Sequence, residues 1–105
     1  MQQQPLTKSD VIDRLRTIQP QIERLGVRRL ALFGSTVRGQ AHTGSDIDLL
    51  VQFDPERKTL RTFMALVFLL EATLERRVEL VTTESLSPLI GPHILREAED
   101  VLHAA

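Results

Sequence analysis

Residues 34–51 read GSTVRGQAHTGSDIDLLV, and this stretch predicts much of the fold. It follows a short, mostly apolar run over residues 29–33 and overlaps a second run over residues 46–53. Runs of this length and composition are typical of buried strands, so the stretch is expected to connect two strands. Between them, a short helix is expected over residues 35–40 and a loop over residues 41–44.

An acidic pair, Asp46 and Asp48, stands where the second strand begins. Alternate residues of a strand point to the same face, so the two carboxylates are expected side by side, with Ile47 pointing into the core. Unpaired carboxylates this close repel each other, and a cation such as Mg²⁺ removes the repulsion by binding both. An isolated Asp-x-Asp is also common as a solvated strand end, so the metal interpretation depends on the neighbouring residues.

The pair Gly34-Ser35 supplies that support at the end of the first strand. Glycine lets backbone amides approach a phosphate closely, and a helix beginning at Ser35 would direct its free N–H groups and positive dipole end at the same phosphate. Gly-Ser alone is also an ordinary helix cap. Together with Asp46 and Asp48, it predicts a phosphate cradle that faces a metal site, so that loop and metal hold opposite ends of one triphosphate.

The rest of the chain predicts one α/β (α+β) domain spanning residues 1–105. Apolar residues at spacings of three and four predict helices over residues 8–25, kinked or split at Pro20, and over residues 60–76. A third strand is expected over residues 78–82 and a final helix over residues 87–103. The expected order of elements is therefore α-β-α-β-α-β-α.

Composition argues against several classes of function. The chain has no cysteine, so it can form neither a disulfide nor a thiolate metal site. Its net charge of -1 gives no polycation, and direct nucleic-acid binding is not expected. Residues 1–6 are expected to be disordered and lack the pattern of a targeting segment, and the longest apolar run, residues 63–70, is too short for a bilayer. We therefore expect a cytoplasmic protein without membrane contact.

The motif Gly-Ser, ten residues, Asp-x-Asp resembles the signature of the DNA polymerase beta nucleotidyltransferase superfamily. The fuller pattern, Gly-Ser-x-x-Arg-Gly over residues 34–39 and Ser-Asp-Ile-Asp-Leu-Leu-Val over residues 45–51, is similar to its minimal nucleotidyltransferase (MNT) branch. The resemblance continues through residues 78–82, 86–88 and 94–98, and so covers about residues 10–102. It implies a nucleotidyltransferase fold, with a small mixed sheet of three or four strands flanked by helices.

The resemblance also implies roles for individual residues. Gly34 and Ser35 would hold the triphosphate of ATP, while Asp46 and Asp48 would bind two Mg²⁺ ions, for which Mn²⁺ could substitute. A third carboxylate normally completes the metal site, and the matching position here is Glu79, where family members usually carry Asp. From the residues alone, Glu79 could instead be an exposed strand residue.

Arg38 has two open interpretations. It lies about one helical turn after Gly34, from which it could reach a β- or γ-phosphate and neutralise developing charge. It could equally form a surface salt bridge.

The function implied by the resemblance is that of an antitoxin. Small MNT proteins are typically encoded with an all-helical HEPN ribonuclease, and some silence it by transferring AMP from ATP to one of its tyrosines. This chain contains no tyrosine, which is compatible with an acceptor on another molecule. Two alternatives stay open: neutralisation of the HEPN toxin by complex formation alone, which the Glu79 replacement permits, and a small-molecule nucleotidyltransferase. The nucleotide base, the number of nucleotides transferred and the oligomeric state do not follow from the sequence.

Overall fold

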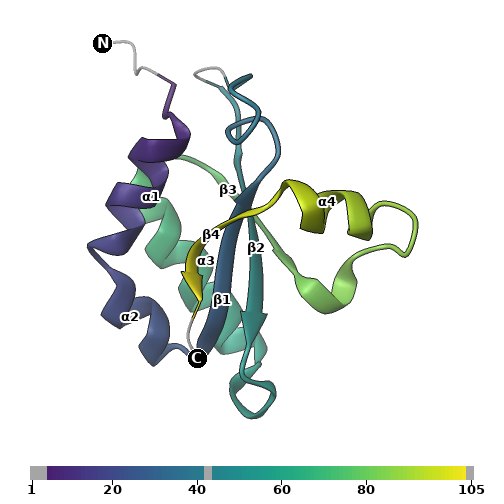
Figure 1. Ribbon diagram of the computed structural model, residues 1–105. Coiled ribbons are helices and arrows are strands. Elements are labelled where there is room, and N and C mark those ends of the chain that lie inside the picture. The colour runs from purple at the N-terminus through teal and green to yellow at the C-terminus, as the bar shows by residue number, and fades with distance from the viewer. Residues whose placement is uncertain (1–4, 42–43, 104–105) are drawn as a thin grey trace.

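A four-stranded mixed sheet, in the order β3-β2-β1-β4, forms the centre of the molecule (Figure 1). The computed structural model describes residues 5–41 and 44–103. Strand β1 pairs antiparallel with both β2 and β4, whereas β2 and β3 run parallel. The expected small mixed sheet is therefore confirmed. The strands are β1 (Val27–Phe33), β2 (Ile47–Phe53), β3 (Val78–Thr82) and β4 (Glu99–His103).

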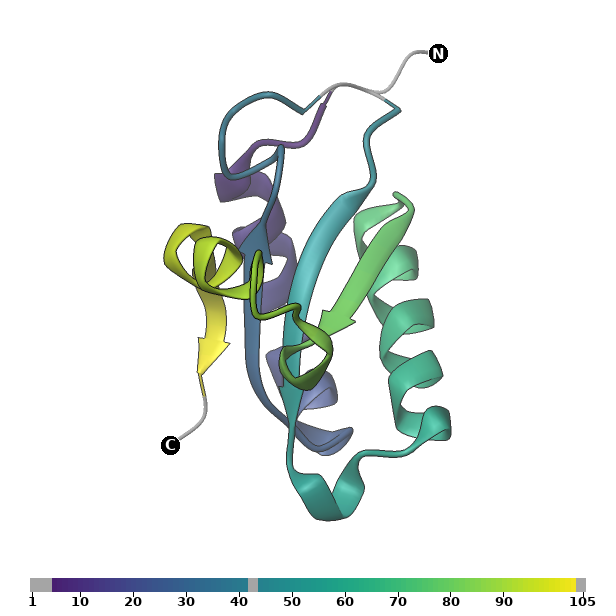
Figure 2. The same ribbon diagram turned by 90° about the vertical axis from the view of Figure 1, so that its right-hand side faces the viewer.

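Four α-helices flank the sheet on two sides within the described part of the chain. The first three cover one face, while the fourth lies against the opposite face (Figures 1 and 2). The described helices are α1 (Lys8–Arg16), α2 (Gln19–Arg24), α3 (Leu60–Leu74) and α4 (Gly91–Glu97), with short 3-10 turns η1 (Pro55–Arg57) and η2 (Thr83–Ser85).

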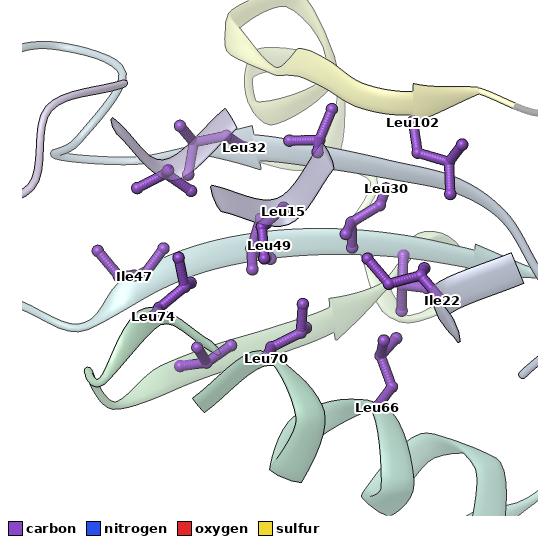
Figure 3. Close-up of a cluster of buried hydrophobic side chains, with 14 of the residues drawn as sticks. Leu15, Ile22, Leu30, Leu32, Ile47, Leu49, Leu66, Leu70, Leu74 and Leu102 are labelled. Carbon is purple, nitrogen blue, oxygen red and sulfur yellow. The ribbon is translucent and has the colours of Figure 1, made fainter. Parts of the chain in front are cut away.

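The hydrophobic core lies between the sheet and helices α1, α2 and α3 (Figure 3). Because side chains alternate along a strand, Leu30 and Leu32 of β1 join this core, while Ala31 between them faces the other side. Ala31 pairs with Leu50 of β2, and both are buried outside the main core cluster. The sheet therefore has a second covered face, and that face leads to the acidic residues.

The N-terminal helical segment divides as the sequence predicts. Helix α1 begins with a capping box, in which Thr7 and Asp10 exchange side-chain-to-backbone hydrogen bonds. Pro20 lies in the first turn of α2, where its missing N–H leaves no helical hydrogen bond unmade. The prediction of a helix over residues 8–25 that splits at Pro20 is confirmed.

The short helix expected over residues 35–40 is wrong, because the chain forms a series of turns there. Gly34 and Gly39 have φ angles of 79° and 73°, which no right-handed helix contains. Only four residues lie between them, so a helix has no room to form.

The final helix expected over residues 87–103 is also wrong over most of its length. Helix α4 begins at Gly91, and after Glu97 the chain extends at Ala98 (φ −64°, ψ 137°) and enters β4. The apolar residues Ile94, Ala98 and Leu102 have helical spacing, but pairing with the free edge of β1 favours a strand. The order of the described α-helices and strands is therefore α-α-β-β-α-β-α-β.

Some expectations concern the chain ends and the loop. Leu6 is buried at 7% exposure in the core, so the disorder expected for residues 1–6 does not extend to it. Residues 1–4 lie outside the described residues, as do His42 and Thr43, which were expected to be loop residues. No described helix combines the length and the apolar content needed to cross a membrane.

Candidate functional site

The turn after β1 brings the backbone of Gly34 against the side chain of Asp48. Phe33, at the end of β1, pairs with Asp48 in the antiparallel ladder, which sets this approach. A Cβ atom at residue 34 would overlap the Asp48 carboxylate and lie 3.0 Å from its Cγ. The positive φ of Gly34 is also one that glycine adopts without strain. Both its conformation and its closeness to Asp48 therefore favour glycine at this position.

The same turn exposes backbone donors. Its backbone hydrogen bonds join the Arg38 amide to the Gly34 carbonyl (3.2 Å), the Gly39 amide to the Thr36 carbonyl (3.3 Å) and the Gln40 amide to the Ser35 carbonyl (2.8 Å). The amides of residues 35–37 donate no hydrogen bond to any residue described here. Successive unpaired amides attract anions. The phosphate cradle expected at Gly34 and Ser35 therefore has a geometric basis, supplied by a turn instead of a helix.

Asp48 and Glu79 are direct neighbours across the parallel strands β2 and β3. Residue 47 pairs with residue 78 one step earlier, and both Ile47 and Val78 are buried on the core side. The alternation of a strand therefore directs Asp48 and Glu79 to the opposite face, where their side chains share a hydrogen bond. The structure thus brings together two of the three predicted carboxylates.

Burial raises the pKa of Asp48 to about 6, and the other acidic groups add to this shift. Next in size are the hydrogen bond that protonated Asp48 donates to Glu79 and the negative charges of Glu79 and Asp46, while the positive charge of Arg38 acts in the opposite direction. The direction follows from physics, since desolvation and like charges both disfavour an ionised carboxylate. The site therefore concentrates negative charge that a cation would relieve.

Asp46 completes the acidic group from the residue just before β2. It is exposed, whereas Asp48 is half-buried, and both line one cavity of about 450 Å³ together with Glu79. Ser35 borders the same cavity, so the phosphate turn and the three carboxylates face a common space. Sequence reasoning did not assign Gln40 or Gly44 to the site. The cavity is lined by Ser35, Gln40, Gly44, Ser45, Asp46, Asp48 and Glu79.

The donor atoms of this cavity fit a magnesium ion that binds together with a phosphate group. The three carboxylates offer oxygen atoms only, which Mg²⁺ prefers. Within residues 5–41 and 44–103, no three Asp, Glu, His or Cys side chains converge as a metal cluster. Magnesium commonly binds through one or two carboxylates and completes its shell with substrate phosphates and water. The pair Asp48 and Glu79, with Asp46 at the same cavity, matches that mode of binding.

Arg38 forms an ion pair with α4. Its Nη1 lies 2.6 Å from Oε1 of Glu97, whose side chain is only 13% exposed, and its Nε donates to Oε1 of Gln40 at 3.2 Å. Of the two interpretations open for Arg38, the structure contains the salt bridge. This contact ties the phosphate turn to α4.

A second cavity, of about 580 Å³, lies on the other side of the Asp48 and Glu79 pair. Its lining residues Gly34, Arg38, Asp48 and Glu79 were expected at the site. The others were not, because only the tertiary fold brings η2, α4 and the segment between them to the sheet. This part of the chain contributes Ser85, Leu86, Ser87, Ile90, His93, Ile94 and Glu97 to the cavity wall.

The chain matches a known family over most of its length. The family described as the nucleotidyltransferase domain matches residues 10–101. A Thermococcus cleftensis protein named protein adenylyltransferase MntA is 48% identical over 75 residues, covering 71% of this chain and 75% of its own length. A Methanocaldococcus jannaschii protein assigned as a protein adenylyltransferase is 41% identical over 87 residues, covering 83% of this chain and 92% of its own length.

Solved structures share the fold. A minimal nucleotidyltransferase superimposes with a TM-score of 0.78 at 35% identity, covering 90% of this chain and 95% of that one. A toxin–antitoxin complex with AMP-PNP (TM-score 0.65, 24% identity, 94% and 75% covered) is more distant. So is a tri-AMPylated Shewanella oneidensis HEPN toxin in complex with MNT antitoxin (TM-score 0.55, 19% identity, 85% and 72% covered). The chain therefore belongs to the nucleotidyltransferase domain family, among its minimal nucleotidyltransferases.

Proposed function

We propose that this chain binds ATP with Mg²⁺ and transfers AMP to a tyrosine hydroxyl of a partner HEPN ribonuclease, as the antitoxin of that pair. The names of the two similar proteins support adenylyl transfer to a protein. The toxin complexes, which resemble the chain in fold, support the class of partner. The acceptor tyrosine belongs to another molecule, because this chain has none.

The observation that carries the proposal is the placement of Asp48 and Glu79 as cross-strand neighbours beside the Gly34 turn. An acidic pair in contact with a turn of free amides suits a substrate that is itself an anion bound with cations. Gly34 and Ser35 hold the triphosphate in this scheme, and Asp46, Asp48 and Glu79 hold two Mg²⁺ ions. Arg38 serves the site by tying this turn to α4 through its ion pair with Glu97.

Transfer is a single displacement at phosphorus. The tyrosine oxygen forms a bond to the α-phosphorus of ATP, the bond to the bridging oxygen breaks, and pyrophosphate leaves. Glu79, which is more exposed than Asp48, orients the hydroxyl and accepts its proton. Bound Mg²⁺ supplies positive charge that neutralises the phosphate oxygens and lowers the pKa of the attacking hydroxyl.

Labelled ATP tests this proposal. The purified chain is incubated with Mg²⁺, its partner toxin and ATP labelled either at the α- or at the γ-phosphate. Label is expected on the partner only from the α-position, because the β- and γ-phosphates leave as pyrophosphate. The double variant Asp46→Asn/Asp48→Asn should lose transfer, while Asp13→Asn, an exposed aspartate on α1, serves as the matched control.

Glu79 offers a finer test of the same site. Its carboxylate sits one methylene further from the backbone than the Asp usual in the family, so its oxygens can shift by about 1 Å. If Glu79 is a working ligand, Glu79→Ala should reduce transfer more than Glu79→Asp does.

A non-catalytic antitoxin is the competing function, and the Glu at position 79 is the feature that favours it. In that case the chain would neutralise the toxin by complex formation alone. Toxin neutralisation that survives in Asp46→Asn/Asp48→Asn, without any labelled partner from the unaltered chain, would establish this alternative and refute the catalytic one.

A further inference from the structure

Two cavities meet at the acidic pair. The cavity of about 450 Å³ and the cavity of about 580 Å³ share Asp48 and Glu79, and they have no other lining residue in common. The shared carboxylates therefore form the boundary between two separate spaces.

The two spaces extend in opposite directions along the parallel strands. The smaller cavity continues to Asp46, two residues before Asp48 in the direction of β2. The larger one continues to Val81, two residues after Glu79 in the direction of β3, and so on the same face of that strand. Along β2 and β3, residues that precede and follow the pair thus line different cavities, while Gly34 and Arg38 of the β1–β2 turn also border the larger one.

The lining of each cavity differs in character. Ser35, Ser45 and Asp46 make the smaller one polar. The exposed wall of the larger one is mostly apolar, from Phe33, Val81, Leu86, Ile90 and Ile94. Its other lining residues besides the shared pair are Gly34, Arg38, Ser85, Ser87, His93 and Glu97. The polar space suits a triphosphate, and the apolar one suits a ring.

In-line displacement at phosphorus requires separate spaces for the attacking group and the leaving group. In a displacement at phosphorus, the attacking and leaving oxygens lie roughly in line, on opposite sides of the reacting atom. If the α-phosphate sits at the shared carboxylates and pyrophosphate leaves through the polar cavity, the attacking hydroxyl arrives from the apolar cavity.

The rim of the larger cavity fits a protein better than a free nucleoside. Ile90, which lines it, is 58% exposed, and Leu89 beside it is 90% exposed. A nucleoside inside the cavity would leave both side chains in water. A protein surface around an inserted side chain would cover them, as apolar surface at protein interfaces is covered.

We therefore propose that the cavity beneath α4 is the acceptor subsite, in which an aromatic hydroxyl side chain of the partner protein enters past Leu89 and Ile90 to reach Glu79. This inference rests on the proposed function and adds to it the side from which the acceptor comes. It also assigns α4, η2 and the segment between them to acceptor recognition and leaves the triphosphate to the polar cavity, which Ser35 borders.

Filling the cavity tests the assignment. Ile94→Trp and Ile90→Trp place a bulky ring in the cavity and at its mouth, while Leu95→Trp on the same helix lies outside the lining and is the matched control. Three quantities are measured: the Kd for Mg²⁺–ATP, the Kd for Mg²⁺–tripolyphosphate, and the rate of transfer from α-labelled ATP to the partner. Thermal unfolding shows whether each variant is folded.

If the cavity is the acceptor subsite, the variants should reduce the rate of transfer without changing the affinity for nucleotide. Both cavity variants should reduce transfer at least about tenfold while the Kd for Mg²⁺–ATP changes less than about twofold, and Leu95→Trp should change neither. If the cavity variants instead weaken ATP at least about tenfold and leave tripolyphosphate unaffected, the base occupies the cavity and the proposal is wrong. Unchanged transfer overturns it as well.

A separate measurement covers the case in which the unaltered chain transfers nothing. The proposed catalytic function then fails, but the affinity of the chain for its partner still reports on the cavity. Ile94→Trp and Ile90→Trp should weaken the affinity for the partner about tenfold, whereas the control Leu95→Trp should leave it unchanged. Unchanged affinity of both variants in a non-transferring chain would remove the subsite too.

Discussion

Asp48 is the residue at which the needs of folding and of function oppose each other. Its carboxylate is half-buried, interacts with Glu79 and is repelled by the negative charge of Asp46. Like charges and lost hydration both disfavour its ionised form, so the free protein is less stable than it would be with a neutral side chain there. Strain of this kind is common where a site must be ready for a charged ligand.

Replacing Asp48 by Asn should therefore stabilise the free protein above pH 6. The folded pKa is raised from the ordinary 3.8 to about 6, so the unaltered chain loses stability as the pH rises through that interval. The variant has no such titration. Because a group this exposed is screened by solvent, we expect its advantage to reach only about 1 kcal/mol above pH 6 and to vanish below about pH 4.

Urea unfolding of both proteins between pH 4 and pH 7.5 measures this difference. The variant Asp13→Asn, which alters an exposed aspartate outside the site, controls for the loss of one negative charge. An equal advantage of Asp48→Asn at every pH would mean that ionisation of Asp48 does not burden the fold.

At this scale the sequence predicted the acidic residues but not their partners. The period of a strand placed Asp46 and Asp48 at one cavity, and pattern matching on the third strand identified Glu79. The Arg38–Glu97 ion pair joins residues 59 positions apart, and no local pattern in the sequence indicates it. Contacts of that kind depend on the packing of whole elements.

Among the elements, β4 shows most clearly where local patterns mislead. Residues 94–102 have the apolar spacing of a helix, yet residues 99–103 pair with β1. Only Val101 and Leu102 of this strand are buried, and an ion pair of 2.6 Å between Arg29 and Asp100 crosses the same two strands. Tertiary pairing thus decides the structure of a segment whose own preference is ambiguous.

The helix predicted in the β1–β2 turn was wrong for a different reason. A glycine before a polar segment predicts a helix start, but Gly34 and Gly39 both adopt positive φ and leave no room for a helix. In contrast, Pro20 predicted the split of the first helical segment, and apolar spacing predicted a helix over residues 60–76, where α3 spans Leu60–Leu74.

If β4 contributes to the core, truncating its buried leucine should lower the free energy of unfolding. Leu102 is 5% exposed and joins the core cluster (Figure 3), so Leu102→Ala should cost about 2–4 kcal/mol of the free energy of unfolding. Leu60→Ala, at a leucine that is 77% exposed on α3, is the same chemical change and should cost less than about 0.5 kcal/mol. Chemical denaturation measures both. Equal, small losses would show that β4 contributes little to the core.

At the scale of the whole molecule, the two faces of the sheet have different roles. Helices α1, α2 and α3 bury one face as a conventional core, and the opposite face carries the acidic pair and both cavities. A chain of 105 residues can therefore keep a full core on one face of its sheet and leave the other face for two cavities.

Binding of Mg²⁺–ATP should stabilise the whole molecule, because the ligand offsets the repulsion among Asp46, Asp48 and Glu79 that the free protein carries. At a concentration about 100 times its Kd, a ligand contributes about 2.7 kcal/mol, which for a domain of this size raises Tm by about 10–20 °C. The rise should disappear in EDTA and in Asp46→Asn/Asp48→Asn, although that variant starts from a higher Tm without ligand. Asp13→Asn should keep the full rise. A Tm that increases as much in EDTA would mean that the carboxylates do not bind nucleotide through a metal.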